Sequence, residues 1–344
     1  MGKENPFTIT FGKQPNRLIS RYEDTDRIIN DFNAQNPVSQ VFMIEGIRGS
    51  GKTVLMTTIA KELAADNKWI VINLNPTMDL LGNFAIRLQD MSKPGHVMLN
   101  KGFNVSAGGF GIGIDAEERS TDYVGIIDKC FKGLFRKKIK VLLTIDEVVH
   151  DENMKIFASQ FQIFVRQDYP VYLIMTGLFE NLSAIQNDPS LTFLLRTPKI
   201  TTGPLSLLQI TRQYKEIFDI EEDKAAGLAA MTKGYAFAFQ ALGVSYWNNR
   251  NRGMNKILDE YDSLLDDFVY RKIWTSLTKK EKEILRLMSD EQIKTGDICK
   301  KMSISSGTFS RYRDGLIKKG IINCPEYGYV ALALPRFSEV IKSY

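Results

Sequence analysis

Short apolar runs alternate with amphipathic stretches along residues 41 to 176. Four runs are rich in β-branched and other apolar residues, and they read VFMIEG (41–46), WIVINLN (69–75), KVLLTID (140–146) and VYLIMTG (171–177). Near-continuous apolar runs of this length are typical of strands that are buried on both faces. Helical patterns at 52–64 and 122–136 lie between them, and this alternation predicts an α/β fold with a parallel sheet and helices on both faces.

The segment GFNVSAGGFGIGID (102–115) interrupts this alternation. Its apolar residues occupy alternate positions around Gly108 and Gly109, which predicts a β-hairpin inserted before the next helix. The glycines lack the G-x-G-x-x-G spacing of a dinucleotide-binding loop, so we expect no second nucleotide site there. Two roles stay open for the hairpin, a structural insert at one edge of the sheet or a finger that binds a partner.

Beyond Pro204 the pattern becomes helical, and it changes again near Tyr270. Amphipathic stretches out to about residue 268 predict a small helical domain. After residue 270, three short helical stretches precede two strand-like runs around the turn residues 325–328. This order of elements is typical of a winged helix-turn-helix.

The composition excludes several classes of protein. The chain has 344 residues, of which 44% are hydrophobic and 25% charged, as in ordinary globular proteins of two or three domains. No run approaches 18 apolar residues without a charge, and the N-terminal residues lack the apolar core of a secretory signal, so we expect a cytoplasmic protein with no membrane partner. Three widely spaced cysteines and two histidines are too few for a disulfide framework or a zinc finger.

The net charge of +5 is concentrated at the C-terminal end. Residues 271–344 carry 15 Lys and Arg against 8 Asp and Glu, a net charge of +7, whereas residues 1–270 carry 30 against 32, a net charge of −2. A basic module on a near-neutral body favours a polyanionic partner. A solvated, lysine-rich surface is the alternative.

The segment GIRGSGKT, from Gly46 to Thr53, follows the first predicted strand and precedes the first predicted helix. It has the G-x-x-x-x-G-K-[ST] spacing of a phosphate-binding loop, or P-loop. Its glycines allow the main chain to approach closely, so that several N–H groups and a helix N-terminus meet the phosphate oxygens. Lys52 would reach the β- and γ-phosphates, and Thr53 would bind Mg²⁺. The residues expected to hold ATP are Gly46, Arg48, Gly49, Ser50, Gly51, Lys52, Thr53 and Val54.

An acidic pair follows the third apolar run. The strand VLLTI ends in Asp146 and Glu147, which is the Walker B arrangement of P-loop proteins. Asp146 would hold Mg²⁺ and its hydration shell together with Thr53. Glu147 would polarise the attacking water as a general base, because the metal would neutralise its neighbour and leave the two carboxylates with different tasks.

Two further residues complete the predicted catalytic set. Thr176 closes the fourth strand, at the edge where ligands bind in open α/β sheets, and it would orient the water or contact the γ-phosphate. Arg196 would stabilise charge on the transferred phosphoryl group, in its own site or in a neighbour's. A threonine that merely closes a strand and an ordinary surface arginine are the alternatives. The predicted catalytic residues are Lys52, Glu147, Thr176 and Arg196.

Taken in order, GIRGSGKT, LLTIDE, LIMTG and KGYAFAFQALG resemble the P-loop ATPases of the AAA+ and STAND group. Over nearly its whole length the chain is similar to the archaeal-type ATPase family, whose members join such a module to a C-terminal winged helix and resemble replication-origin initiators. Only the P-loop and the Walker B motif are highly specific. The resemblance implies a P-loop ATPase domain at 1–203, a helical lid at 204–269 and a winged helix at 270–344.

The sequence departs from the family pattern in two places. Ser20-Arg21-Tyr22 replaces a Gly-Arg-Glu motif that lies near the adenine in relatives, so the resemblance makes Arg21 a nucleotide contact but puts the details in question. Gly234-Tyr235-Ala236 has alanine where STAND relatives carry proline. It also offers no arginine where many AAA+ proteins have a second sensor, and Lys233 is only a weak substitute.

The expected recognition helix of the winged helix spans about 305–319. Hydroxyl and arginine side chains near its first half suit contacts to phosphates and base edges in a major groove, with lysines at positions 318 and 319 at its end. Tyr327, near the tip of the wing, would add a further contact. The alternative is a module that docks protein or inhibits the ATPase. The residues expected to contact double-stranded DNA are Thr308, Ser310, Arg311, Arg313 and Lys318.

The sequence therefore predicts a slow, magnesium-dependent ATPase that acts as a nucleotide switch. ATP and ADP would favour different positions of the lid, because only ATP offers a γ-phosphate, and this would change the exposure or spacing of the winged helix. Self-association stays open. The alternatives are a nucleotide-gated DNA-binding regulator without significant hydrolysis and a scaffold whose winged helix docks protein.

Overall fold

The computed structural model describes residues 4–10, 15–92 and 122–344, and the chain divides into two compact units. The sheet unit contains Tyr22–Glu45 and Lys52–Thr201. The lid unit contains Met1–Arg21, Gly46–Gly51 and Thr202–Tyr344. The hairpin predicted at 102–115 lies outside the described residues, and the division into three domains stays a prediction.

Five parallel strands form the centre of the sheet unit, in the order β2-β3-β4-β1-β5. The four apolar runs predicted as strands are the first four of them. The apolar pattern does not predict β5, because only three residues form it. The strands are β1 (Val41–Glu45), β2 (Trp69–Leu74), β3 (Lys140–Ile145), β4 (Val171–Gly177) and β5 (Lys199–Thr201).

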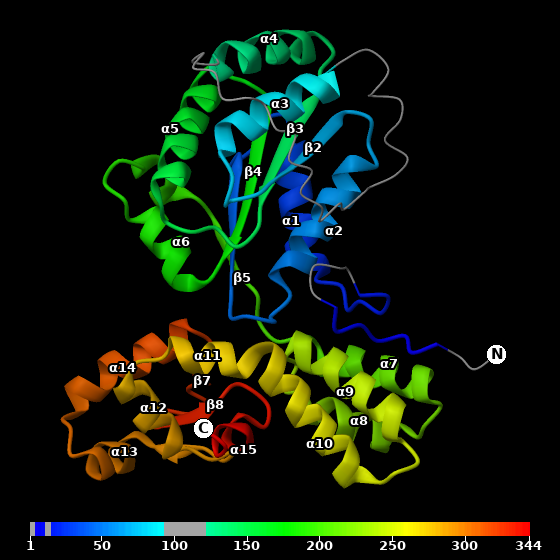
Figure 1. Ribbon diagram of the computed structural model, residues 1–344, viewed down its shortest axis with the longest axis vertical. Coiled ribbons are helices and arrows are strands. Elements are labelled where there is room, and N and C mark those ends of the chain that lie inside the picture. The colour runs from blue at the N-terminus through cyan, green and yellow to red at the C-terminus, as the bar shows by residue number, and fades with distance from the viewer. Residues whose placement is uncertain (1–3, 11–14, 93–121) are drawn as a thin grey trace, which may run out of the picture. The chain divides into compact units, whose positions relative to one another are not determined.

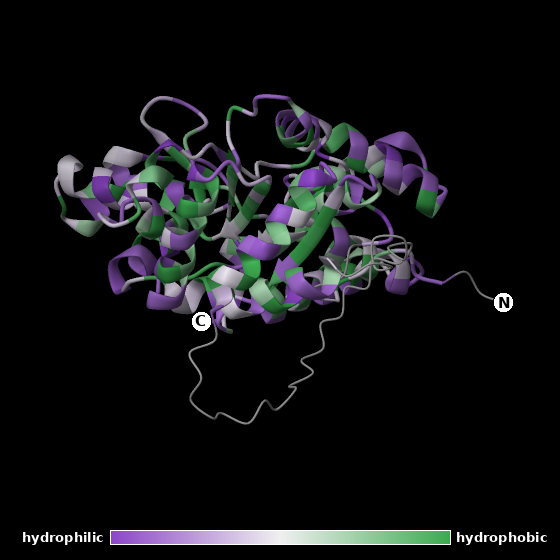
Figure 2. Ribbon diagram, turned by 90° about the horizontal axis from the view of Figure 1, so that it is seen from above, coloured by the Kyte–Doolittle hydropathy of each residue, from purple (hydrophilic) through white to green (hydrophobic). Residues whose placement is uncertain are grey.

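Helices cover both faces of this sheet (Figure 1). Successive strand residues point to opposite faces, so Val41 and Met43 enter one core while Phe42 and Ile44 enter the other. The strands are accordingly coloured mostly hydrophobic in Figure 2, whereas the helices mix both colours. The helices are α1 (Tyr22–Asn33), α2 (Lys52–Ala64), α3 (Leu80–Ser92), α4 (Tyr123–Arg136), α5 (Glu152–Arg166), α6 (Phe179–Gln186) and the 3₁₀ helix η2 (Thr192–Arg196).

The lid unit is mainly helical and contains one continuous hydrophobic core, which includes Phe7 and Ile19 of the N-terminal segment and residues from Leu205 to Ile341. Its short strands form an antiparallel sheet in the order β6-β8-β7. Among the described residues of the whole chain, no helix is both long and apolar enough to cross a membrane. The helices are α7 (Leu207–Phe218), α8 (Glu222–Met231), α9 (Ala236–Asn249), α10 (Met254–Leu265), the π-helical turn η3 (Asp266–Tyr270), α11 (Arg271–Ser276), α12 (Lys279–Arg286), α13 (Thr295–Met302), α14 (Ser306–Lys318) and α15 (Phe337–Ile341). The strands are β6 (Ile293–Lys294), β7 (Ile322–Asn323) and β8 (Tyr329–Leu332).

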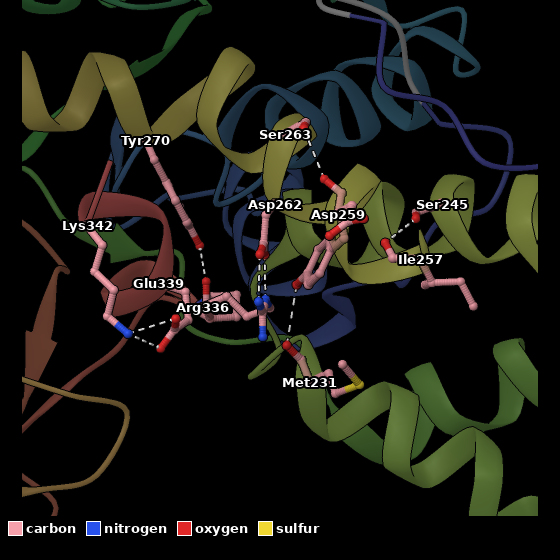
Figure 3. A network of polar contacts seen from close by, with 12 residues as sticks. Met231, Ser245, Ile257, Asp259, Asp262, Ser263, Tyr270, Arg336, Glu339 and Lys342 are labelled. Atoms are coloured by element: carbon pink, nitrogen blue, oxygen red, sulfur yellow. Dashed lines mark hydrogen bonds and ion pairs between the residues drawn. The ribbon is translucent and has the colours of Figure 1, made fainter. Parts of the chain in front are cut away.

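Polar contacts join α10 and η3 to the C-terminal residues of the same unit (Figure 3). Arg336 forms an ion pair with Asp262 of α10, in which Nη2 donates to Oδ2 at 2.6 Å. The buried hydroxyl of Tyr270 donates to the carbonyl of Pro335 at 2.7 Å. The helices before residue 270 and the elements after it are therefore connected by hydrogen bonds as well as by a shared core.

The N-terminal segment packs on the lid helices through Phe7. Its ring centroid lies 5.8 Å from that of Tyr214 and 5.6 Å from that of Phe239. This close approach requires glycine at position 243 of α9, because an added Cβ there would lie 2.4 Å from the Phe7 ring. Gln240 of the same helix accepts a hydrogen bond from the N–H of Thr8 at 3.0 Å.

We expect Gly243→Ala to destabilise the protein by about 1–3 kcal/mol, because the new methyl group would displace the Phe7 ring. The matched control is Gly227→Ala in α8, where an added Cβ has no neighbour within 4 Å and should stabilise the helix by about 1 kcal/mol. Urea unfolding measures both. The explanation fails if Gly243→Ala costs as much in a Phe7→Ala background as in the wild type.

Candidate functional site

The segment Gly46–Gly51 forms a tight turn between β1 and α2. Gly49 and Gly51 have φ angles of +73° and +94°, in the region that favours glycine. The N–H of Ser50 donates to the carbonyl of Ile47 at 3.2 Å and closes the turn. Lys52 follows as the first residue of α2 and is only 8% exposed. The glycines of the predicted P-loop thus occupy positions whose main-chain conformation favours glycine.

Two residues at the start of α9 donate hydrogen bonds to two carbonyl groups of this turn. The hydroxyl of Tyr235 donates to the carbonyl of Arg48. The N–H of Phe237 donates to the carbonyl of Gly49 at 3.0 Å. A Cβ added to Gly49 would lie 2.3 Å from the Tyr235 hydroxyl, so the contact also requires this glycine. The sequence identifies the lid segment around Tyr235 but assigns no role to its side chain.

Ser50 and Arg21 connect the turn to the residues that follow β5. The hydroxyls of Ser50 and Thr202 lie 2.6 Å apart and share a hydrogen bond. Arg21 Nη2 donates to the carbonyl of Ser50 at 3.2 Å and to that of Gly203 at 2.5 Å. Arg21 therefore lies beside the P-loop and supports the main chain there, a role that the sequence does not predict. Its contact with the nucleotide stays a prediction.

The side chains of Thr53, Asp146 and Thr176 meet at the carboxyl ends of the strands. The Thr53 hydroxyl donates to Asp146 Oδ2 at 2.8 Å, and the Thr176 hydroxyl donates to Asp146 Oδ1. A hydroxyl next to a carboxylate offers the hard oxygen ligands that Mg²⁺ prefers. The described residues contain no cluster of three or more His, Cys, Asp or Glu suited to a metal. The Mg²⁺ site stays a prediction.

Glu147 is exposed and has a φ angle of +53°, which is uncommon for a residue with a side chain. The left-handed conformation costs about 1–2 kcal/mol. Its N–H donates to Asp146 Oδ1 at 3.1 Å and to Thr176 Oγ1 at 3.2 Å, and these bonds hold the strained backbone. Strain that neighbouring contacts maintain is frequent at functional sites. The two adjacent carboxylates therefore have different environments, and their different catalytic tasks stay a prediction.

Two further predicted residues, Arg196 and Val54, make no side-chain hydrogen bond or ion pair with the residues described above. Arg196 is exposed at the end of η2, and its side chain makes no hydrogen bond or ion pair with any residue that the structure describes. Its catalytic role stays a prediction. Val54 is half-buried in the first turn of α2, where its carbonyl accepts a hydrogen bond from Thr58 at 2.9 Å.

The residues expected to contact DNA lie on one helix, α14, which begins after Ser305. Ser305 caps it by accepting a hydrogen bond from the N–H of Thr308 at 3.2 Å. Arg313 Nη2 contacts Ser310 Oγ at 3.1 Å and Asp314 Oδ1 at 3.0 Å, so this arginine is partly neutralised by its neighbour. Arg311 is exposed, and so is Lys318 at the end of the helix. Tyr327, between β7 and β8, is fully exposed.

Two lysines, Lys319 and Lys233, contact other elements of the lid unit. Lys319 forms an ion pair with the buried carboxylate of Glu281, with Nζ and Oε1 2.8 Å apart. Glu281 also accepts a hydrogen bond from the N–H of Thr278 and completes the capping box of α12. Lys233 donates to the carbonyl of Leu332 at 3.1 Å and approaches Asp290, so it contacts β8. Neither interaction has a local sequence signal.

Comparisons with known proteins bear on the fold of the chain. Residues 267–341 match a family described as a domain of unknown function (DUF8462). No curated protein matches the chain. A Walker-type ATPase of Pyrococcus abyssi is similar in structure, with a TM-score of 0.65 at 15% identity over 94% of this chain and 96% of that one. The Aeropyrum pernix ORC2 protein, in ADPNP and ADP complexes, gives a TM-score of 0.61 at 14% identity over 97% and 96%.

A third structure, Cdc6p of Pyrobaculum aerophilum, gives a TM-score of 0.50 at 16% identity over 97% of this chain and 96% of that one. At these identities the likeness shows the fold. Together with the five-stranded parallel sheet and its flanking helices, it confirms a P-loop NTPase fold.

We expect Thr176→Val to destabilise the protein by about 1–3 kcal/mol, because the change removes one of two partners of the Asp146 carboxylate and one of two partners of the Glu147 N–H. The control is Thr144→Val, whose hydroxyl donates to the exposed Asn73 at 2.5 Å and can be replaced by water. Equilibrium urea unfolding should show a clearly smaller loss for the control. Equal losses would mean that Thr176 only packs in the strand.

Proposed function

We propose that the chain is a slow, Mg²⁺-dependent ATPase that acts as a nucleotide switch on a DNA-binding winged helix. The observation that carries the enzymatic part is that the hydroxyls of Thr53 and Thr176 both donate to the carboxylate of Asp146. Thr53 follows the P-loop, whose glycines have positive φ angles. Likeness to proteins whose names describe a Walker-type ATPase and an ORC2 protein bound to ADPNP and ADP supports it.

The phosphates of ATP would bind to the turn between β1 and α2. Main-chain N–H groups of Gly46–Gly51 and the N-terminus of α2 would face the phosphate oxygens. Lys52 is nearly buried at this helix end, where its charge would offset that of the phosphates. Arg21 would support the turn through the carbonyl of Ser50.

Thr53 and Asp146 would hold Mg²⁺ through their side-chain oxygens. The metal ion would neutralise charge on the β- and γ-phosphates. Glu147, exposed beside this pair, would accept a proton from the attacking water while its backbone stays fixed by Thr176. Arg196 would stabilise the transferred phosphoryl group, within one molecule or across a self-association contact.

This function predicts different effects for two variants of the site. Lys52→Ala should abolish ATP binding, because the remaining amides no longer have a cation beside them. Glu147→Gln should retain ATP binding and reduce phosphate release by at least about 100-fold, because the amide cannot take the proton of the water. Isothermal calorimetry and a phosphate-release assay measure the two effects.

Asp168→Asn is a suitable control for Glu147→Gln, since Asp168 is another exposed carboxylate with a positive φ angle and precedes β4. Wild-type protein that binds ATP and releases no phosphate would favour the alternative, a nucleotide-gated regulator. Wild-type protein that binds no ATP with Mg²⁺ present would exclude both.

We infer DNA binding from the C-terminal elements. The order α12, β6, α13, α14, β7 and β8 supports the proposal of a winged helix, and the net charge of +7 on residues 271–344 supports a polyanionic partner. Helix α14 would enter the major groove with Thr308, Ser310, Arg311 and Arg313, while Tyr327 would contact the backbone from the wing. The nucleotide state would act on this module through the helices α7 to α10, with which it shares a core.

We expect duplex DNA to bind with an affinity that falls steeply as salt rises. Arg311→Ala should weaken binding about 5-fold or more and reduce the salt slope by about one, because it removes one exposed cation of α14. Arg252→Ala removes the same charge from an exposed loop before α10 and should change neither value. Fluorescence anisotropy at two salt concentrations decides, and no binding at low salt would favour protein docking.

A further inference from the structure

We propose that Tyr235 is a positioning residue of the nucleotide site, which orients a phosphate-binding amide of the P-loop and connects the loop to β8. The proposal rests on the nucleotide-binding function proposed above. Its basis is the hydrogen bond from the Tyr235 hydroxyl to the carbonyl of Arg48. The residues involved, Gly46–Gly51 and the helices after Thr202, belong to one compact unit.

Peptide geometry determines what this bond does. A peptide unit is planar and trans, so the carbonyl of Arg48 and the N–H of Gly49 point in opposite directions. By holding the carbonyl on the side of α9, Tyr235 directs the N–H of Gly49 to the other side of the turn. An N–H that points away from the lid is free to meet a phosphate oxygen.

A second bond constrains the next peptide unit. The N–H of Phe237 donates to the carbonyl of Gly49 at 3.0 Å, so the N–H of Ser50 also points away from α9 and reaches the carbonyl of Ile47 at 3.2 Å. Gly49, with its φ angle of +73°, has the conformational freedom to turn its peptide units over when nothing holds them. The two lid contacts remove this freedom on both sides of Gly49.

Tyr235 is suited to this task because it is rigid and stays protonated. Its side chain is 6% exposed and stacks beside Tyr270, with ring centroids 6.5 Å apart. Burial raises the pKa of its hydroxyl, so the group remains a donor over the physiological pH range. Aromatic packing holds the ring, and the hydroxyl therefore reaches the Arg48 carbonyl without loss of side-chain freedom on nucleotide binding.

The neighbouring residues extend the contact to the C-terminal elements. Lys233, two residues before Tyr235, donates to the carbonyl of Leu332 at the end of β8 at 3.1 Å. Between them, Gly234 accepts a hydrogen bond from the N–H of Leu205 at 2.7 Å and has a φ angle of +72°. The segment from Lys233 to Tyr235 thus contacts the P-loop at one end and β8 at the other.

Tyr235→Phe tests the role of the hydroxyl, because the ring and its packing are retained. We expect the Kd for ATP and ADP, and the KM for ATP, to rise about 5-fold or more, with kcat changed by less than about 2-fold. Calorimetry and steady-state phosphate release measure these values. In the same variant, the change in DNA affinity between the ATP and ADP states should become smaller.

Two other buried tyrosines provide matched controls in the same core. The hydroxyl of Tyr214 donates to the carbonyl of Phe239 and that of Tyr270 to the carbonyl of Pro335, each at 2.7 Å. Tyr214→Phe and Tyr270→Phe therefore lose the same kind of bond, and their Kd and KM should stay within about 2-fold of the wild type. Thermal unfolding without nucleotide checks that all three variants fold.

The outcomes separate this proposal from the function on which it rests. If wild-type protein binds ATP, Lys52→Ala does not, and Tyr235→Phe binds as tightly as wild type, only the role of Tyr235 is wrong. The same conclusion follows if Tyr214→Phe weakens binding as much as Tyr235→Phe. If wild-type protein binds no nucleotide, the proposed function fails, and the role of Tyr235 fails with it.

Discussion

Burial of the parallel sheet on both faces is the constraint on which the candidate site depends. With helices on each side, the strands carry mostly apolar side chains, and the polar groups of the candidate site lie where the strands end. The neighbouring strands β3, β4 and β1 end in Asp146, in Thr176 and in the P-loop. Parallel direction brings these ends to one edge, which explains how three short segments far apart in the sequence place hydroxyls on one carboxylate.

Local patterns were sufficient for four of the five strands and for recognising the motifs, because each depends on residues close together in the chain. Continuous apolar runs mark β1 to β4, and glycine spacing marks the P-loop. The contacts of Tyr235 and Lys319 could not be predicted in this way. Tyr235 bonds to a carbonyl 187 residues away, and Lys319 pairs with a glutamate 38 residues away. A buried tyrosine or a helix-terminal lysine has no sequence pattern that reveals its partner.

The shared core of the lid unit bears on how a nucleotide signal would reach the C-terminal elements. Arg336 pairs with Asp262, Tyr270 bonds to Pro335, and one cluster of buried side chains includes residues from both sides of position 270 (Figure 3). Independent movement of residues 271–344 would expose part of this core and break the ion pair. If α7 to α15 move together, the core stays buried and the ion pair stays intact. The proposed switch would therefore use the lid helices and the C-terminal elements as one body.

The absence of an arginine from Gly234-Tyr235-Ala236 changes what the lid would contribute to such a switch. A sensor arginine contacts the phosphate itself, so its interaction exists only when nucleotide is bound. Tyr235 and Phe237 instead bind carbonyl groups of the P-loop main chain. These two bonds constrain the peptide units on both sides of Gly49. A lid that supports the turn in this way would respond to the shape of the P-loop main chain rather than directly to the charge of the γ-phosphate.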